Sequence, residues 1–238
     1  MRKPNTILAL STLGNKSSVA LAHKESCWQA TSDNEKHVNI LTGLLEEVQK
    51  KSGCTWRDMD VIVCDVGPAS LTGVRVGLST VQGLALPYNT PVWPRVHHEI
   101  LAWQYCQYLK VHQEKQPAVG QQIWVADDAR MQAISWAVFQ LDRKNTLITH
   151  QKPMLITPEA LQTQLHNAQK QPLLLGNAWA VYQKELGEVL TKGQRIEERQ
   201  ELSLAGAMVD LALATSKQAE LITQNAQDLQ AFYLRPPV

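Results

Sequence analysis

The residues whose types and spacing could do chemistry follow a short apolar run at positions 61–64. Asp65 comes first, Gly67 and Pro68 form a turn, and the hydroxyl side chains of Ser70 and Thr72 follow. A glycine turn between a strand and a helix can bind phosphate, because its backbone amides donate hydrogen bonds to an anion. The motif loop, residues 67–72, is therefore either a phosphate site or the base of a helix that contacts a partner.

Other polar residues point to structural roles more than to catalysis. Ser70 and Thr72 precede or begin a predicted helix, and without a positioned histidine or acid we expect helix capping instead of nucleophilic attack. Asp127 and Asp128 could form an acid/base pair, but we expect Asp128 to orient its turn by accepting from backbone NH groups. The histidines lack the HxxxH spacing of a helical metal site. We predict no bound metal and no cofactor.

Composition limits the functions that the chain can have. Of its 238 residues, 44% are hydrophobic and 19% charged, which is typical of a globular protein that buries a core. The net charge is +1, from 23 basic and 22 acidic side chains, so no strong positive field favours nucleic acid binding by the chain alone. The four cysteines form no CxxC pair, and no run approaches the roughly 20 apolar residues that span a bilayer. We expect a cytoplasmic protein with reduced thiols and no membrane contact.

Hydrophobic periodicity predicts strands first and then an alternation of helices and strands. Residues 7–13 and 17–22 should form a hairpin around Gly14 and Asn15, with a third strand at 25–30. The predicted elements that follow are a helix at 37–51, a buried strand at 61–64, a helix at 71–86, a strand at 91–94 and a helix at 97–109. This order is typical of an α/β fold.

A polar stretch at 113–121 is the candidate linker to a second cycle of the same kind. The elements predicted after it are strands at 122–126, 132–140, 147–150 and 172–175, a helix opening at Thr157, and a helix at 202–217. We therefore predict two lobes, residues 1–112 with the motif loop and partner-binding helices, and residues 113–238. The last helix is a candidate to pack back on the first lobe.

The two helices of the first lobe carry apolar residues around more of their circumference than one sheet needs. Gly73 and Gly77 lie four residues apart, which would let another helix approach closely, and a Gly77→Trp change should block assembly while the monomer folds. Arg75 could meet an anion, a partner carboxylate or a surface acid. The side chains predicted to bind a partner are Ile40, Leu41, Leu44, Leu45, Val48, Gly73, Val74, Arg75, Gly77, Leu78 and Val81. The alternative is that these faces only pack on their own sheet.

Residues 67–75, GPASLTGVR, and 82–85, QGLA, resemble the GPGSFTGxRxG…QGLA signature of the bacterial TsaB (YeaZ) family. DARM at 128–131, GNAW at 176–179 and YLRPP at 233–237 follow in the family's order, so the resemblance covers nearly the whole chain. It implies the actin-like, hexokinase-like ATPase fold, with two lobes built on ribonuclease-H-like sheets.

The resemblance also implies a non-catalytic role in tRNA threonylcarbamoyladenosine formation. In that system the paralogue TsaD carries the metal and transfers a threonylcarbamoyl group to the adenosine beside the anticodon, and TsaE is an ATPase that joins the complex. The implied partners are therefore a TsaD-like catalytic subunit and a TsaE-like ATPase. We further expect a homodimer in isolation, and contact with tRNA only through the complex.

Three departures from the family pattern bear on catalysis. Ser11 stands where family members usually have an aspartate, and active relatives need an acid there for the metal–phosphate end of the nucleotide site. Ala69 replaces a loop glycine and Leu71 the usual phenylalanine, which makes a phosphate-wrapping backbone less available. The remaining alternative is an active ATPase or sugar-kinase-like phosphotransferase of the same fold.

Overall fold

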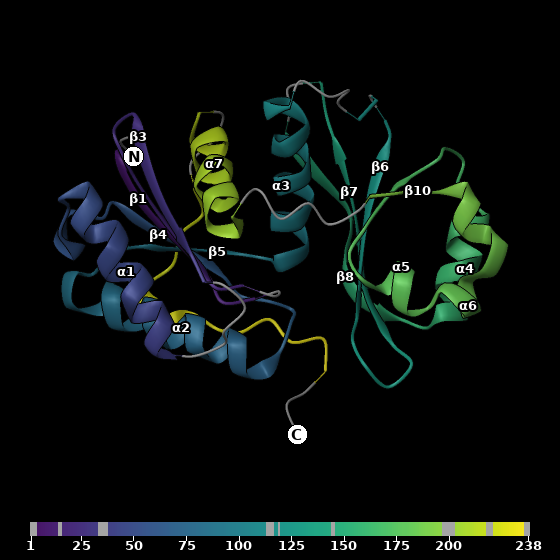
Figure 1. Ribbon diagram of the computed structural model, residues 1–238, viewed down its shortest axis with the longest axis horizontal. Helices are drawn as coiled ribbons and strands as arrows, with labels where there is room; N and C mark the ends of the chain where they lie inside the picture. Colours follow the sequence, from purple (N-terminus) through teal and green to yellow (C-terminus); the bar gives the residue numbers. More distant parts are fainter. Residues whose placement is uncertain are drawn as a thin grey trace. The chain divides into compact units, whose positions relative to one another are not determined.

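The computed structural model describes residues 4–13, 16–32, 38–112, 117–118, 120–143, 146–196, 203–217 and 221–235, without the side chains of residues 38 and 39. The chain forms two compact units (Figure 1). The first comprises Met1–Ile100 and Glu201–Tyr233, and the second comprises Leu101–Gln200 and Leu234–Pro236. Helix α3 (His97–Val111) contains the point of division, and the boundary predicted near residue 112 stays a prediction.

The first unit is built on a five-stranded sheet with the order β3-β2-β1-β4-β5. Its strands are β1 (Thr6–Ser11), β2 (Ser18–His23), β3 (Ser26–Thr31), β4 (Val61–Asp65) and β5 (Val92–Arg95). The first three pair in antiparallel fashion, whereas β1, β4 and β5 run parallel. The predicted meander and its α/β continuation are thus confirmed, while the turn predicted at Gly14 and Asn15 lies outside the described residues.

Helices cover both faces of this sheet (Figure 1). Every residue of β1 and of β4 is therefore buried. One face packs on α1 (Val38–Ser52) and α2 (Leu71–Ala85), and the other on α7 (Leu204–Ser216). The core under α1 and α2 contains Leu8, Leu10, Val19, Leu21, Leu41, Leu44, Val48, Ile62, Val74, Leu78 and Val81. Side chains alternate between the two faces of each strand, so the same strands serve both cores.

Residues 221–233 return to the first unit. Residue Gln224 pairs with Val92 of β5, and the 3-10 helix η4 (Ala226–Asp228) follows. Ala226 and Leu229 are buried in the core under α1 and α2, and the Gln82 side chain of α2 donates to the Ala226 carbonyl oxygen at 3.2 Å. Residues 221–233 therefore complete the core that the first hundred residues begin.

The second unit has a five-stranded sheet with the order β10-β9-β6-β7-β8. Its elements are β6 (Gln122–Asp128), β7 (Ile134–Leu141), β8 (Leu147–Ile156), α4 (Pro158–His166), β9 (Leu173–Leu175), α5 (Ala178–Val181), α6 (Gln183–Leu186), η3 (Gly187–Lys192) and β10 (Gln194–Arg195). Trp124, Trp136 and Trp179 lie in its core. The short elements α5, α6, η3 and β10 were not expected from the sequence.

Each unit has a sheet with both parallel and antiparallel strand pairs, together with helices. This confirms the predicted two-lobed α/β class. The cysteines are free thiols, with Cys27 exposed and the other three buried. Burial raises the pKa of the Cys106 thiol to about 12, so this group is unreactive at neutral pH. Within the residues described, no helix combines the length and apolar character required to cross a bilayer.

Candidate functional site

The carboxyl ends of β1, β4 and β5 meet at one edge of the first sheet, because the three strands are parallel. Ser11, Asp65 and Arg95 are the last residues of these strands. In α/β sheets this edge is where ligands and functional loops are usually found. The motif loop begins here and leads into α2, so the sequence prediction points to the same place as the topology.

Asp65 is the centre of a buried hydrogen-bond cluster at this edge. Its Oδ2 accepts from Ser11 Oγ at 2.9 Å and lies 2.8 Å from His97 Nδ1, while its Oδ1 accepts from the Gly67 amide at 3.2 Å. The Asp65 side chain is fully enclosed and that of His97 nearly so. An ionised carboxylate only accepts hydrogen bonds, so Nδ1 of His97 then carries the shared proton.

The motif loop is held by other segments of its own unit. Gly67 has a φ of 97°, and a Cβ there would lie 3.0 Å from the Phe232 carbonyl oxygen, so only glycine fits comfortably. The His97 amide donates to the Gly67 carbonyl at 2.8 Å, and the Phe232 amide donates to the carbonyl of Val66 at 2.8 Å. Gly67 is buried, Pro68 is half-buried, and Ser70 and Thr72 are exposed.

Ser70 caps α2, as predicted: its hydroxyl accepts from the Gly73 amide at 3.3 Å. Thr72 lies in the first turn of the helix. The Ser70 hydroxyl is engaged by a backbone amide and not by a histidine, so the geometry does not support the nucleophile interpretation.

Gly73 and Gly77 face the chain's own β1. A Cβ at Gly77 would lie 2.7 Å from Thr12 Oγ1, and one at Gly73 would lie 2.8 Å from the Thr12 carbonyl oxygen. The two glycines therefore allow the end of β1 to approach α2 closely. The expectation that Gly77→Trp leaves the monomer folded is wrong, because the added ring would collide with Thr12 inside the unit.

Most residues predicted to bind a partner are buried under the two helices. Three of the predicted residues are accessible: Arg75 is exposed, and Ile40 and Gly73 are half-buried. The buried members are Leu41, Leu44, Leu45, Val48, Val74, Gly77, Leu78 and Val81. Their packing on the sheet sets the position of the helices, and their direct contact with a partner stays a prediction.

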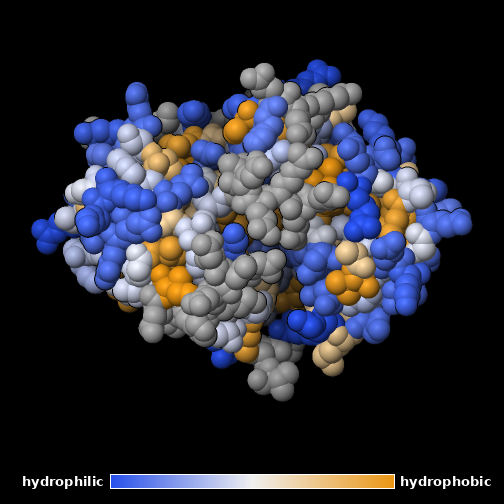
Figure 2. Space-filling view, viewed as in Figure 1, coloured by the Kyte–Doolittle hydropathy of each residue, from blue (hydrophilic) through white to orange (hydrophobic). Residues whose placement is uncertain are grey.

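Other residues of α1 and α2, outside the predicted set, also reach the surface. Val76 and Leu84 are half-buried apolar side chains, and Leu86, just after α2, is 50% exposed. A Cβ at Gly43 or Gly83 would meet no atom within 4 Å, so these two glycines face open space. The space-filling view shows a small apolar patch in the region of α2, with hydrophilic side chains around it and over most of α1 (Figure 2). Helical spacing alone did not distinguish these outward glycines from Gly73 and Gly77.

Asp128 of the second unit orients a turn, as the sequence predicted. Its Oδ1 accepts from the Arg130 amide at 2.9 Å and from the Tyr182 hydroxyl at 2.7 Å. Burial, together with this hydrogen bond, raises the pKa of Tyr182 to about 12. Asp127 accepts instead from the Asn177 amide at 3.1 Å. Both carboxylates thus accept hydrogen bonds from backbone amides. This arrangement supports a structural role in the turn and not the function of an acid/base pair.

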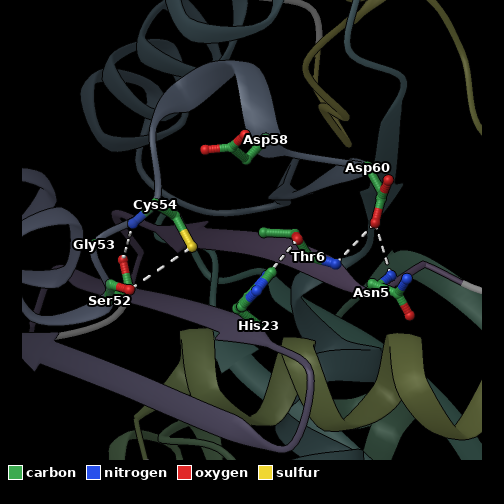
Figure 3. A pocket seen from close by; sticks show the side chains of 8 residues that line it. All are labelled: Asn5, Thr6, His23, Ser52, Gly53, Cys54, Asp58 and Asp60. Atoms are coloured by element: carbon green, nitrogen blue, oxygen red, sulfur yellow. Dashed lines mark hydrogen bonds between the residues drawn. The ribbon is translucent and has the colours of Figure 1, made fainter.

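A depression of about 440 Å³ lies at the opposite, amino edge of the first sheet (Figure 3). Asp60 accepts there from the Asn5 and Thr6 amides at 2.7 and 2.8 Å, and Asp58 accepts from the Thr55 amide at 2.7 Å. The residues that line it are Asn5, Thr6, His23, Ser52, Gly53, Cys54, Asp58 and Asp60. Its carboxylates hold turns of the backbone, and it contains none of the predicted site residues. Across the described part of the chain, no three His, Cys, Asp or Glu side chains are arranged to hold a metal ion.

Comparison with known proteins extends these observations. The family model described as "TsaD: tRNA N6-adenosine threonylcarbamoyltransferase" matches residues 31–234. The curated protein "tRNA threonylcarbamoyladenosine biosynthesis protein TsaB" of Escherichia coli (strain K12) is 27% identical over 96% of this chain and 94% of its own length. Its namesake from Haemophilus influenzae is 26% identical over 98% of this chain and 94% of its own length. The solved structure "YeaZ from Pseudomonas aeruginosa" has a TM-score of 0.76 at 22% identity, covering 97% of this chain and 100% of that one.

The two mixed sheets with their helices define a protein of the two-lobed, actin-like ATPase class, and the family model spans both units. The chain belongs to this TsaD-related family, and within it to the TsaB/YeaZ family. The resemblance drawn from the motif loop is therefore confirmed.

Proposed function

We propose that the chain is a non-catalytic scaffold subunit of a complex that transfers a threonylcarbamoyl group to the adenosine next to the anticodon of tRNA. It heterodimerises with a TsaD-like catalytic subunit and supports binding of a TsaE-like ATPase. The names of the curated relatives, which are tRNA threonylcarbamoyladenosine biosynthesis proteins, support the process. The scaffold role is supported by the outer surface of α1 and α2 and by the carboxyl edge of the first sheet.

The observation that carries the proposal is the outer surface of α1 and α2. After these helices have covered the sheet, Val76 and Leu84 remain partly exposed, and Gly43 and Gly83 are open positions on the same two helices. Helices with small residues outward allow a second pair of helices to approach closely, as in a four-helix bundle. A TsaD-like subunit is the proposed occupant. The same surface would serve a homodimer when that subunit is absent.

The edge of the sheet supports a non-catalytic role. Ser11 takes the place of the acid that the family pattern puts there, and it donates a hydrogen bond to Asp65 at 2.9 Å. A second carboxylate at this distance would repel Asp65 unless a cation or a proton lay between them. With serine present, Asp65 is enclosed by its own hydrogen-bond partners, which supports a structural role for this carboxylate. Contact with tRNA would then be made through the assembled complex.

The test uses the full chain with a TsaD-like transferase, a TsaE-like ATPase, tRNA and threonylcarbamoyl-adenylate. We expect tRNA modification to require this chain, and heterodimer formation to fall at least about tenfold in Gly43→Arg and Gly83→Arg, since each puts a long charged side chain at the closest approach. Gln164→Arg is the matched control, because it adds the same side chain at an exposed helical position of the second unit.

Two outcomes would contradict the proposal. Modification at full rate without the chain would exclude the scaffold role. Steady ADP formation from ATP by the chain alone would favour the alternative, an active ATPase or sugar-kinase-like phosphotransferase. Sedimentation velocity with and without the TsaD-like subunit separates the heterodimer from the homodimer, and both should be lost together in the two arginine variants.

A further inference from the structure

We propose that Asp65 is the positioning residue of the partner surface: its buried carboxylate fixes the motif loop and the start of α2 relative to β1. This inference rests on the proposed function only for the partner contact. Its structural half, the placement of the loop and of the first turn of α2, concerns the chain alone and is measured separately.

The first step is the convergence of three segments on one carboxylate. Ser11 ends β1, Gly67 begins the motif loop and His97 begins α3, and each places a polar atom within 3.2 Å of an Asp65 oxygen. The cluster is buried, so water cannot replace a lost donor or acceptor. Hydrogen bonds to charged groups are among the stronger ones in proteins, and leaving a buried group unpaired is costly.

The second step is a closed ring of contacts from Asp65 to α2 and back. In one direction the Gly67 amide leads along the loop to Ser70, whose hydroxyl accepts from the Gly73 amide. In the other direction Ser11 leads to Thr12, whose Oγ1 donates to the Gly73 carbonyl at 2.7 Å. Both routes end on the two backbone polar groups of one residue, so moving the Asp65 carboxylate displaces the first turn of α2 from both sides.

The third step is the chemistry of the smallest possible change. Asparagine has nearly the shape of aspartate, but it offers one acceptor oxygen and an NH2 group. The Ser11 hydroxyl, the Gly67 amide and His97 face the two carboxylate oxygens. In Asp65→Asn the Gly67 amide keeps the amide oxygen as its acceptor, while the Ser11 hydroxyl and His97 Nδ1 must turn from donors to acceptors toward the NH2 group. The ring then keeps its packing volume but loses its charge-assisted hydrogen bonds, which weakens its hold on the loop.

The experiment compares Asp65→Asn with Asp60→Asn. Asp60 is the matched control, because its carboxylate also holds the backbone at an end of β1, through the Asn5 and Thr6 amides, but at the other edge of the sheet. The Leu13 amide donates to Ser11 Oγ at 3.3 Å, so it reports on the same cluster as Gly73. In the free chain we expect amide hydrogen exchange at Gly73 and Leu13 to rise at least about tenfold in Asp65→Asn and to stay within about twofold in Asp60→Asn. Equal exchange at these amides in both variants would overturn the inference.

The partner readout is the affinity for the TsaD-like subunit, compared at temperatures where each variant is fully folded by circular dichroism. We expect a loss of about tenfold in Asp65→Asn and less than about twofold in Asp60→Asn. Unchanged affinity in Asp65→Asn would overturn the positioning role for the partner surface. A wild-type chain that binds no TsaD-like subunit would instead overturn the proposed function, and the exchange data would still decide the structural half.

A milder variant covers the case in which Asp65→Asn does not fold. Ser11→Ala removes one hydrogen bond to Asp65 and leaves the carboxylate and His97 in place. We expect the same pattern with a smaller size, about fivefold in exchange at Gly73 and in affinity, since one hydrogen bond to a charged group is lost. Protection at Gly73 that is unchanged in Ser11→Ala would contradict the ring of contacts.

Discussion

Thr12 and Gly73 are joined by a hydrogen bond from the threonine Oγ1 to the glycine carbonyl oxygen, 2.7 Å long. One turn further along α2, a Cβ at Gly77 would lie 2.7 Å from the same Oγ1. The glycine pair therefore exists for a contact between α2 and the end of β1, and this contact fixes the helix that carries the proposed partner surface.

Gly77→Ala should destabilise the protein, although alanine favours a helix more than glycine does. The collision with Thr12 Oγ1 should outweigh the gain in helix propensity, for a net loss of about 1–2 kcal/mol in the free energy of unfolding. Urea denaturation measures it. Gly83→Ala is the control, because its Cβ meets open space and should stabilise by up to about 1 kcal/mol. If the changes in unfolding free energy caused by Gly77→Ala and Thr12→Ala add up in the double variant within about 0.5 kcal/mol, the two residues are not in contact.

Tyr182→Phe should cost about 1–3 kcal/mol of unfolding free energy at neutral pH, because the hydroxyl donates to the Asp128 carboxylate. The pKa of Tyr182 is raised to about 12, so its stabilising contribution is complete below the unfolded pKa of about 10 and is lost as the pH rises from 10 through 12. Urea denaturation at pH 8 and pH 11 should show the wild-type advantage over Tyr182→Phe shrinking. Tyr88→Phe, which removes an exposed hydroxyl, is the control. An advantage of constant size for Tyr182 would contradict the assignment.

Asp58 should contribute to stability in the opposite pH direction. Its hydrogen bonds from the Thr55 amide and hydroxyl lower the pKa of the carboxyl group below its ordinary value. The contribution is therefore present above the unfolded pKa of about 4 and is lost as the pH falls through the lower folded value. Compared with the wild type, Asp58→Asn should have a flatter stability profile between about pH 4 and pH 2. Thermal unfolding across this pH range measures the two profiles, with the exposed Glu188→Gln as control. Parallel profiles for the wild type and Asp58→Asn would contradict the prediction.

Leu229→Ala should destabilise the first unit by about 2–5 kcal/mol, because the side chain is buried in the core under α1 and α2. Ile222→Ala, seven residues earlier, is the matched control: its side chain is 88% exposed and should cost less than about 0.5 kcal/mol. Chemical denaturation compares the two. Similar losses would mean that residues 221–233 do not complete this core.

Local signals in the sequence predicted much of the fold. The strand at 61–64, the glycine turn and the helix from residue 71 were expected from an apolar run, a Gly-Pro pair and a helical period, and the structure has β4 and α2 there. Ser70 as the cap and Asp128 as the turn-forming carboxylate were also predicted correctly. These features depend on neighbours a few residues away, which is why one sequence is enough to find them.

Features that depend on distant residues were not predictable in the same way. The spacing of Gly73 and Gly77 is the same whether they face a partner or β1, and only the position of Thr12 decides it. Asp65 was noted beside the motif loop, but Ser11 and His97 reach it across 54 and 32 positions of sequence. The two-residue β10 and the four-residue α5 and α6 are too short to show a period.

The return of residues 221–233 to the first unit has a consequence for how the protein is made. A ribosome releases the chain from the amino end, so Met1–Ile100 emerges long before Leu229 and Phe232 exist. Leu101–Gln200 can complete most of its own unit before residues 221–233 emerge, whereas the first unit lacks part of its core until they do. A chain that stops before Leu229 would leave the core under α1 and α2 incomplete, so the unit whose synthesis starts first is completed after most of the second unit has been made.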